Sequence, residues 1–484
     1  MSTRLSQLLR ANLDVDPVIC GVTADSRRVR PGYLFAALPG AKVDGRSFMR
    51  PAVDAGAAAI LAGEAHPELP VPVAAAWDVR RAYALAAGAF YGTQPKTVVA
   101  VTGTNGKTSV AAFCRQIFDA LGHKSASMGT LGVALSPRAG GEQLLPPGLT
   151  TPDAADVAAN LADLARRGVT HLCMEASSHG IDQRRLDAVR LTAAGFLNLT
   201  QDHLDYHGTM GAYRASKLRL FDTLLPREGT AVLNADSDAY GAFASASVMA
   251  GHTLMSVGAD GQGIRLISRA AVSNGQRLTL GYGGQTFETL LPLAGAFQAS
   301  NALVAAGLCI AAGEDAGDVF AALEQIQGAP GRLQRVGRSP RGGEAYVDYA
   351  HTPDGLETVL KALRPHAKGR LMVVFGAGGD RDRTKRPLMG RAAAELADLA
   401  IVTDDNPRTE DPAAIRAAIL SAAPGAVEVA DRREAIEAAV AQLRDGDVLV
   451  VAGKGHEQGQ IVGSVTHPFD DVAEVAAALG VRHG

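Results

Sequence analysis

The chain has 484 residues, of which 47% are hydrophobic and 20% charged, a balance typical of a soluble globular protein with two to four domains rather than of a disordered chain. Its formal net charge of −3 gives no strong field, so binding to nucleic acid or to an anionic membrane surface is not expected. The sequence has no uncharged apolar stretch long enough to predict a membrane span. The first residues do not resemble a signal peptide, because Arg10, Asp14 and Asp16 interrupt their apolar positions.

Glycine and proline residues divide the chain into three predicted α/β domains. Residues 1–94 form a small N-terminal domain that ends at the linker-like "YGTQPKT". Residues 95–329 alternate strand-like and helical segments, which predicts a central parallel sheet. Within this domain, the alternating stretch between residues 252 and 292 predicts an antiparallel appendage with turns at Asn274-Gly275 and Gly283-Gly284. Residues 330–484 place strands ahead of polar loops, as a C-terminal Rossmann-like α/β domain does.

The segment "GTNGKTS" stands between a predicted strand and a predicted helix, which is the setting of a phosphate-binding loop. Gly103 and Gly106 let backbone N–H groups turn toward phosphate oxygens. Lys107 offers a charge to the β and γ phosphates, and Thr108 can ligate Mg²⁺. Val101 occupies the place of the first glycine in the standard pattern. The alternative is a glycine-rich turn that binds nothing.

Acidic and histidine side chains follow two further predicted strands. Glu175 ends "VTHLCME", and its carboxylate suits a hard cation near the glycine loop if the two strands are neighbours. The alternative is a solvated loop acid. In the loop after the next strand, four such residues stand close together: Asp202, His203, Asp205 and His207. This loop is either a second metal site or an ordinary polar loop.

Three more charged residues have both an ordinary and a functional interpretation. Lys217 lies on a predicted helix, where a lysine by default extends its ammonium group to solvent; the alternative is a site lysine with altered chemistry. Arg332 and Asp348 stand at the start of the third domain. An Arg there can reach a transferring phosphoryl group, and an Asp can accept from a ribose hydroxyl. Surface ion pairing is the alternative.

The four cysteines are far apart in the sequence and have neither CxxC nor zinc-finger spacing. Reduced, packed thiols are therefore expected. A reducing, cytoplasmic compartment follows from that expectation.

Ten motifs occur in one order along nearly the whole chain: "TGTNGKTS", "TTPD", "MEASSHG", "NLTQDHLDYHGT", "YRASK", "GRLQ", "VDYAHTPD", "GGDRDRTKRP", "DNPR" and "GKGHE". Together they resemble the motifs of the Mur ligase family. The resemblance implies an amide ligase of peptidoglycan synthesis that uses ATP and Mg²⁺, and we expect it to be a monomer in the cytoplasm. It also implies that the carboxylate of UDP-N-acetylmuramoyl-L-Ala-D-Glu (UDP-MurNAc-L-Ala-D-Glu) takes the γ phosphate to form an acyl phosphate. The amine of the incoming amino acid then attacks, giving UDP-MurNAc-tripeptide.

The resemblance further implies roles for individual residues. The nucleotide would be bound by Gly103, Thr104, Asn105, Gly106, Lys107, Thr108, Ser109, Asn301, Arg332 and Asp348. The metal ligands would be Thr108, Glu175, His203 and a carbamylated Lys217; Lys107, Glu175, His203 and Lys217 are the implied catalytic residues. The UDP-sugar peptide would contact Ser26, Thr150, Thr151, Ser177, Gln183 and Arg185.

In this family "DNPR" resembles the signature for meso-diaminopimelate, whose distal carbon carries both an amine and a carboxylate. Arg408 can form a paired hydrogen bond with that carboxylate, which a lysine substrate lacks. Asp405 and Asn406 supply acceptors, and Pro407 limits loop motion. The other implied contacts to the amino acid are Arg381, Gly453 and Glu457.

Two competing functions share parts of this pattern. Folylpolyglutamate synthetase has the same phosphate loop and acyl phosphate chemistry. The "ADSRRV" and "DNPR" segments favour the Mur ligase function over this one. A switch NTPase that binds partners would hydrolyse ATP without the two small substrates. Residues 136–145 match no contact and stay unassigned.

Overall fold

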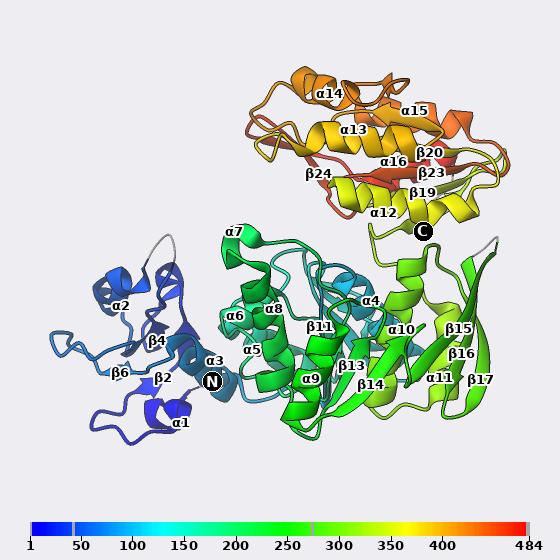
Figure 1. Ribbon diagram of the computed structural model, residues 1–484. Coiled ribbons are helices and arrows are strands. Elements are labelled where there is room, and N and C mark those ends of the chain that lie inside the picture. Colours follow the sequence, from blue (N-terminus) through cyan, green and yellow to red (C-terminus); the bar gives the residue numbers. More distant parts are fainter. Residues whose placement is uncertain (1, 41–43, 273–274, 481–484) are drawn as a thin grey trace. The chain divides into compact units, whose positions relative to one another are not determined.

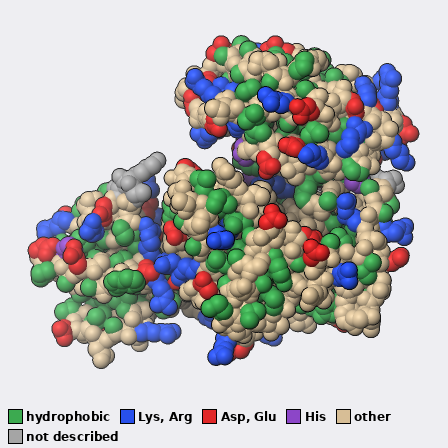
Figure 2. Space-filling model, in the orientation of Figure 1, with side chains coloured by type: hydrophobic (Ala, Val, Ile, Leu, Met, Phe, Trp, Pro, Cys, Tyr) green, Lys and Arg blue, Asp and Glu red, His purple; other side chains and the backbone are tan. Residues whose placement is uncertain are grey.

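The computed structural model describes residues 2–40, 44–272 and 275–480, and Figure 1 shows its ribbon. The chain forms two compact units. Unit 1 is Met1–Arg265 with Leu303–Ala322, and unit 2 is Leu266–Ala302 with Leu323–Gly484. None of the helices described is both long and apolar enough to cross a membrane. On the face in Figure 2, positive and negative side chains are interspersed on each unit, in line with the small net charge.

The N-terminal part of unit 1 is a parallel sheet of order β3-β4-β5-β6 with apolar clusters packed against it. Its strands are β3 (Gly21–Thr23), β4 (Tyr33–Ala36), β5 (Ala59–Ala62) and β6 (Val73–Ala75). Around them lie β1 (Thr3–Arg4), α1 (Leu5–Leu9), β2 (Val18–Ile19), η1 (Ser26–Arg28), η2 (Gly45–Phe48) and α2 (Met49–Asp54). Helix α3 (Val79–Tyr91) begins where the Asp78 carboxylate accepts a hydrogen bond from the Arg81 N–H and ends at Gly92, whose φ is +76°.

The larger part of unit 1 is built on the strand order β10-β9-β8-β11-β7-β12-β13-β14, of which β8 to β14 in that order are parallel. The strands are β7 (Thr97–Thr102), β8 (Ser125–Gly129), β9 (Gly132–Leu135), β10 (Gln143–Leu145), β11 (His171–Glu175), β12 (Ala193–Phe196), β13 (Thr230–Asn234) and β14 (Thr253–Gly258). All residues of β7 and β11 are buried, as expected for parallel strands covered on both faces. The segment 136–145 supplies η3 (Pro137–Ala139) and the antiparallel edge strand β10.

Helices cover this sheet and carry the loops of interest. They are α4 (Lys107–Ala120), α5 (Ala154–Arg166), α6 (Ser178–Asp182), α7 (Leu204–His207), α8 (Met210–Arg219), η4 (Leu220–Leu224), α9 (Tyr240–Ala250), α10 (Ala296–Ala311) and α11 (Ala316–Ala322). Helices α3 and α5 pack together, which joins the two parts of unit 1 through one continuous core.

The antiparallel appendage is present, with one correction to its start. It consists of β15 (Ile264–Val272), β16 (Gly275–Tyr282) and β17 (Gln285–Leu291), and β16 pairs antiparallel with β17 through a turn at Gly283-Gly284. Both glycines have positive φ, as a tight hairpin requires. Asn274 of the other predicted turn lies outside the described residues. Residues 253–258 do not belong to the appendage, because they form β14, parallel to β13.

The C-terminal part of unit 2 is a six-stranded sheet of order β18-β19-β23-β20-β21-β22, parallel except for the edge strand β18. The strands are β18 (Gln334–Arg338), β19 (Glu344–Asp348), β20 (Leu371–Phe375), β21 (Leu399–Val402), β22 (Val427–Glu428) and β23 (Val448–Ala452). Two apolar cores lie on its faces, one with α12 (Pro353–Leu363), α13 (Lys385–Leu396) and α14 (Pro412–Leu420), the other with α15 (Arg432–Gln442) and α16 (Asp471–Leu479). The remaining elements are η5 (Leu323–Gln325), η6 (Arg364–His366) and the hairpin of β24 (Gly459–Val462) and β25 (Val465–Pro468).

This mixed α/β architecture, with a central parallel sheet and separate N- and C-terminal sheets, is the predicted fold class. The domain limits at residues 94 and 329 stay a prediction. The carboxyl ends of neighbouring parallel strands meet at one edge of each sheet, so the loops that follow them are the natural place for a site.

Candidate active site

The glycine loop lies between β7 and α4. Gly106 precedes α4 with a φ of +91°, and no described side chain caps this helix, so its first N–H groups can bind an anion. A Cβ at Gly103 would lie 2.9 Å from Cβ of Leu197, which is why the loop needs glycine there. The ammonium group of Lys107 donates to the carbonyl oxygens of Gly103 and Thr104 at 2.8 and 2.9 Å.

Glu175 lies directly beside this loop, because β11 pairs with β7 and sets Glu175 opposite Val101. Its Oε1 accepts a 3.0 Å hydrogen bond from the Thr108 hydroxyl and a 2.8 Å bond from the Thr130 N–H. The carboxylate is buried, so it is not a solvated loop acid. Gly129 touches it, and a Cβ at that position would collide with the carboxylate. This cluster of oxygen donors is the ligand chemistry that Mg²⁺ prefers.

Lys217 of α8 is buried against the same loop. Only 1% of it is exposed, its Nζ donates to the Gly103 carbonyl at 2.8 Å, and it lies 4.5 Å from the centre of the Tyr213 ring. Burial and the charge of Lys107 lower the pKa of Lys217 well below its ordinary value, and Asp202 opposes this shift. The default expectation of a lysine extended to solvent is therefore wrong.

Asn198 is a loop residue to which the motif analysis gave no role. Its Oδ1 accepts from the backbone N–H groups of Thr104 and Asn105 at 3.1 and 2.9 Å, and its Nδ2 donates to the Asn105 carbonyl at 3.1 Å. The side chain thus fixes the loop that was predicted to bind phosphate. Its place in "NLTQDH" was the available signal, but nothing in the spacing marks it as a loop clamp.

A hydrogen-bonded network joins most residues predicted to bind the UDP-sugar peptide. The Thr151 hydroxyl donates to the Glu175 carbonyl at 3.0 Å and lies 3.0 Å from Oγ of Ser177, which caps α6. Arg185 donates to the Thr151 carbonyl at 2.6 Å and to Oε1 of Gln183 at 2.7 Å. Burial lowers the pKa of Arg185.

Three further residues predicted to belong to the site, Thr150, Ser26 and His203, lie outside the hydrogen bonds just described. The Thr150 hydroxyl lies 2.9 Å from that of Thr130, a residue missed by the motif analysis. Ser26 begins η1 beside the N-terminal sheet, and among the described residues no hydrogen bond joins it to the network. His203 has a φ of +52° and packs edge-on against His179, with its Nε2 3.4 Å from Asp202.

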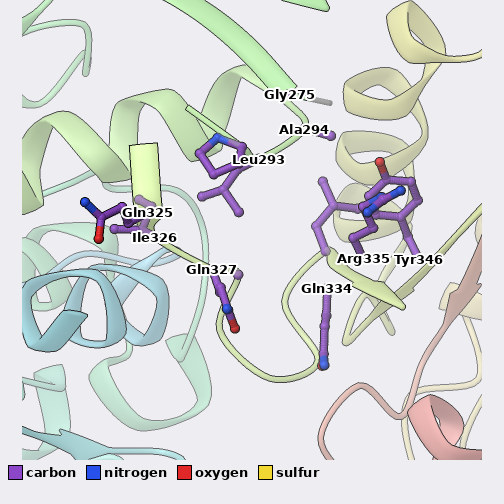
Figure 3. Close-up of a pocket in the computed structure, with 12 residues that line it drawn as sticks. Gly275, Leu293, Ala294, Gln325, Ile326, Gln327, Gln334, Arg335 and Tyr346 are labelled. Atoms are coloured by element: carbon purple, nitrogen blue, oxygen red, sulfur yellow. The ribbon is translucent and has the colours of Figure 1, made fainter. Parts of the chain in front are cut away.

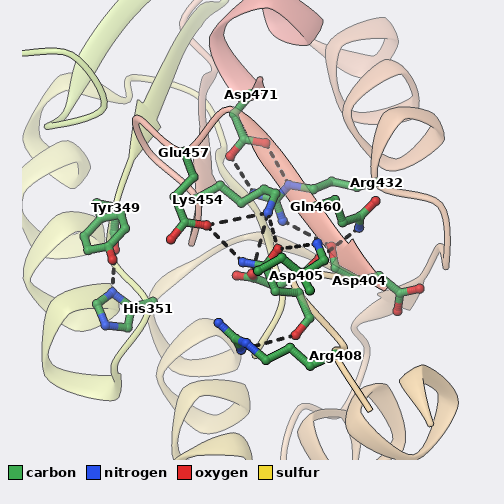
Figure 4. A network of polar contacts seen from close by, with 12 residues as sticks. Tyr349, His351, Asp404, Asp405, Arg408, Arg432, Lys454, Glu457, Gln460 and Asp471 are labelled. Carbon is green, nitrogen blue, oxygen red and sulfur yellow. Dashed lines mark hydrogen bonds and ion pairs between the residues drawn. The ribbon is translucent and has the colours of Figure 1, made fainter. Parts of the chain in front are cut away.

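In unit 2, the "DNPR" loop follows β21, and Figure 4 shows its polar contacts. The Arg408 guanidinium donates to the carbonyl oxygens of Gly379 and Asn406 at 2.8 and 3.5 Å. Within the described part of the chain, no carboxylate lies within ion-pair distance of Arg408. A Cβ at Gly378 would lie 2.8 Å from Nη1 of Arg408, so glycine makes room for the guanidinium. The Arg408 backbone is fixed by bonds to Ile461 and Gly463 beside β24.

A network of polar side chains, partly buried, contacts this loop (Figure 4). Lys454, which is 0% exposed, donates to Oδ1 of Asn406 at 2.8 Å and lies 3.9 Å from Asp405. Asn406 in turn donates to Glu457 at 2.9 Å. Gly453 has a φ of +121°, and a Cβ there would lie 2.7 Å from the Asp405 carboxylate. The loop therefore has little freedom to rearrange.

Beside this network, Arg432 and Asp471 form a buried ion pair at 2.6 Å. Sequence reasoning missed this pair and Lys454, although Lys454 stands inside "GKGHE". Arg381, in contrast, is exposed and donates only to the Asp380 carbonyl at 3.1 Å among the described residues. The Pro407 carbonyl accepts from Glu410 N–H, which closes the turn after "DNP".

The predicted nucleotide residues of unit 2 also cluster. Asp348 accepts from the N–H groups of Leu333 and Ala350 at 2.6 and 2.8 Å, and burial raises its pKa, which Arg332 opposes. The Arg332 guanidinium lies over the Tyr349 ring at 4.7 Å. Asp348 is buried and bonded to backbone N–H groups, so for this residue the surface-pair interpretation is wrong. The buried Asn301 amide donates to Gln298 at 3.2 Å.

A separate cavity of about 310 Å³ lies in unit 2 (Figure 3). Its lining includes Leu293, Gln327, Gln334, Arg335 and Tyr346. None of the predicted site residues lines it, so we do not assign the chemistry to this cavity.

Comparisons with known proteins agree with these observations. Residues 101–309 match the model of the Mur ligase middle domain, residues 331–455 that of the Mur ligase glutamate ligase domain, and residues 18–91 that of the Mur ligase family catalytic domain. A UDP-N-acetylmuramoyl-L-alanyl-D-glutamate–2,6-diaminopimelate ligase of Caulobacter vibrioides is 68% identical over 481 residues, covering 99% of each chain. A solved structure of a ligase with that name is 33% identical, with a TM-score of 0.76 and 99% of each chain covered.

A folylpolyglutamate synthase of Mycobacterium tuberculosis, complexed with ADP, is more distant. It is 20% identical, with a TM-score of 0.62, and the match covers 78% of this chain and 92% of the synthase. At that identity the similarity concerns the fold alone.

Proposed function

The chain belongs to the Mur ligase family, and on this premise we propose that it is an ATP-dependent ligase that joins meso-diaminopimelate to UDP-MurNAc-L-Ala-D-Glu. The product is the UDP-MurNAc-tripeptide of peptidoglycan synthesis. The proposal is supported by the 68% identity to a ligase named for this nucleotide-linked dipeptide and for 2,6-diaminopimelate. We further propose that the chain acts as a monomer in the cytoplasm.

The reaction needs activation because a carboxylate is a poor electrophile. In the proposed first step, an oxygen of the D-glutamate carboxylate attacks the γ phosphorus of ATP, the bond to ADP breaks, and an acyl phosphate forms. The diaminopimelate amine then attacks the acyl carbon and loses a proton, and inorganic phosphate leaves as the tetrahedral intermediate collapses. Mg²⁺, when bound, offsets the repulsion between the carboxylate and the triphosphate.

The side chains of unit 1 fit the phosphoryl half of this reaction. The N–H groups at the start of α4 and the Lys107 ammonium group suit the β and γ phosphates. Thr108 and Glu175, whose oxygens are 3.0 Å apart, suit Mg²⁺, with His203 and a modified Lys217 as the further proposed ligands. The proposed UDP-sugar peptide contacts are Ser26, Thr150, Thr151, Ser177, Gln183 and Arg185.

Lys217 suits carbamylation because it is buried beside a second lysine. Its neutral amine would attack CO₂, form a C–N bond and lose a proton, which converts a cation into a carboxylate. Such a group resolves the problem of a lysine in a cation site, because the ammonium form repels Mg²⁺ and the carbamate binds it.

One observation carries the choice of amino acid: the Arg408 guanidinium is bonded to main-chain carbonyls and to no described carboxylate. Its remaining N–H groups suit the distal carboxylate of diaminopimelate. Asp405, Asn406, Glu457, Gly453 and Arg381 are the other proposed contacts. Lysine would leave these donors unpaired, which costs about 1.5–3 kcal/mol for hydrogen bonds to a charged group.

The test compares different amino acids as the third residue to be added, each in the presence of ATP, Mg²⁺ and UDP-MurNAc-L-Ala-D-Glu. Meso-diaminopimelate and L-lysine are a matched pair, because they differ only in the distal carboxylate. Phosphate release and product mass should show kcat/KM for diaminopimelate higher by about 10- to 100-fold or more. Comparable use of lysine would reverse the assignment.

Two controls separate the other enzyme classes. ATP hydrolysis that ignores both small substrates would indicate a switch NTPase instead of a ligase. Extension of pterin-glutamate by glutamate would indicate a folylpolyglutamate synthetase.

A further inference from the structure

Two histidines and a glutamate come together in unit 1, away from the glycine loop. Nε2 of His123 lies 2.9 Å from Oε1 of Glu314, and Nε2 of His171 lies 3.7 Å from the same oxygen. One ligand atom from each side chain lies within 4.8 Å of the other two. We propose that His123, His171 and Glu314 form a binding site for Zn²⁺ or a similar transition-metal ion, with a water molecule as the fourth ligand.

The backbone delivers each side chain by a defined turn. His123 follows α4 after Gly122, whose φ is +95°, and Glu314 follows α10 after Gly313, whose φ is +107°. Both helices therefore end in glycine turns that present a ligand just beyond the helix carboxyl end, where the helix dipole favours a cation. His171 is the first residue of β11.

The spacing agrees with tetrahedral zinc. Bonds of about 2.0–2.2 Å at tetrahedral angles place ligand atoms about 3.3–3.5 Å apart. The two distances to Oε1 of Glu314, 2.9 and 3.7 Å, lie on either side of this value.

The hydrogen bond on the far side of His171 is an independent observation. The Thr170 hydroxyl lies 2.9 Å from Nδ1 of His171 and 3.3 Å from the Lys124 carbonyl oxygen. With a proton on Nδ1, the Nε2 atom presents its lone pair toward the Glu314 carboxylate, 3.7 Å away. An outer hydrogen bond on Nδ1 is the usual orientation of a metal-bound imidazole.

The surroundings suit a site that holds its ion. The His123 and His171 rings lie 3.9 Å apart, and Phe118 packs 4.7 Å from His171. The His171 and Glu314 side chains are 9% and 16% exposed, whereas His123 is 31% exposed and leaves a path for entry. The charge of Lys96 acts on the His171 imidazole. Lys96 opposes cation binding, but it is exposed and can turn to solvent.

This site differs from the one proposed for Mg²⁺ in position and chemistry. Glu175 ends the strand that His171 begins, and four residues of a strand span about 13 Å. Imidazole nitrogens favour zinc over Mg²⁺, which takes oxygen ligands. A zinc ion here would tie together the end of α4, the start of β11 and the turn after α10.

The experiment uses the full-length chain without a histidine tag, stripped with a chelator and kept in excess Mg²⁺. Zn²⁺ is titrated against a chromophoric chelator, and bound metal is counted by mass spectrometry. One Zn²⁺ per chain with micromolar or tighter affinity is expected, together with a higher Tm. His171→Gln and Glu314→Gln should weaken binding at least about ten-fold.

Matched variants make each outcome decisive. His467→Gln, an exposed histidine of β25, and Glu175→Gln should both keep the zinc affinity. His123→Gln changes the most exposed ligand, so it tests the site should the buried variants misfold. Three outcomes would each overturn the proposal. The unaltered chain could fail to bind Zn²⁺, or His123→Gln and Glu314→Gln could keep its zinc affinity. An anomalous zinc peak elsewhere in a crystal would be the third.

Discussion

The ammonium group of Lys217 donates a 2.8 Å hydrogen bond to the carbonyl oxygen of Gly103, the first glycine of the loop between β7 and α4. Lys107 donates to the same oxygen at 2.8 Å. Two lysines on one buried acceptor repel each other, and this is why one of them is a candidate for chemical modification.

Lys217→Ala should therefore abolish ligase activity, and added bicarbonate should not restore it, because the side chain that would carry the carbamate is gone. Activity is measured by phosphate release with both substrates present. A mass spectrum of the unaltered protein, produced with isotope-labelled bicarbonate, checks directly whether Lys217 carries the additional mass of a carbamate.

Lys361→Ala is the matched control, since Lys361 is exposed on α12. Full activity in Lys217→Ala, with the Tm of the unaltered chain, would contradict the role of Lys217.

Arg408→Lys should raise KM for meso-diaminopimelate by about 10- to 100-fold, because a lysine cannot form the paired hydrogen bond to the distal carboxylate. Use of L-lysine should change little, so the discrimination between the two amino acids narrows. Arg391→Lys, at an exposed position of α13, is the control. An unchanged ratio of kcat/KM values in Arg408→Lys would exclude Arg408 from substrate selection.

Asp471→Asn should lower the free energy of unfolding by about 3–5 kcal/mol, because it leaves the fully buried Arg432 guanidinium without its counter-charge. Urea unfolding followed by circular dichroism gives the value. Arg433 and Glu474 offer a control between the same two helices, 2.8 Å apart, with Arg433 exposed. Glu474→Gln should leave the urea midpoint nearly unchanged, and equal losses in both variants would show that burial is not the cause.

His456 predicts an acid-dependent loss of stability. Burial and the nearby Arg332 lower the pKa of His456 from 6.5 to about 4. Between these values the unfolded chain binds a proton that the folded chain does not, so this contribution to stability falls as pH drops from 6.5 toward 4. His456→Asn should reduce the slope of urea midpoint against pH in that window. His467→Asn serves as the control, and an unchanged slope in His456→Asn would refute the assignment.

Sequence reasoning singled out the glycine loop, Glu175 and the "DNPR" loop as candidates because each follows an apolar strand, and the ends of strands can be read from the local pattern. It missed Asn198, Thr130 and Lys454, whose partners are far away in the sequence. It also placed residues 253–258 in the antiparallel appendage, because alternation along a short segment does not reveal whether its neighbour is parallel.

The sequence by itself determined which residue types are present and in which order: a phosphate loop, two acidic or histidine loops, and a guanidinium between acids. Only the tertiary structure decided which of them meet. Strand order is set by long-range pairing. Because β11 lies beside β7, Glu175 reaches Thr108. Because β23 lies between β19 and β20, Lys454 reaches Asn406. Burial is likewise a property of the whole fold, and it alone separates Lys217 from an ordinary surface lysine.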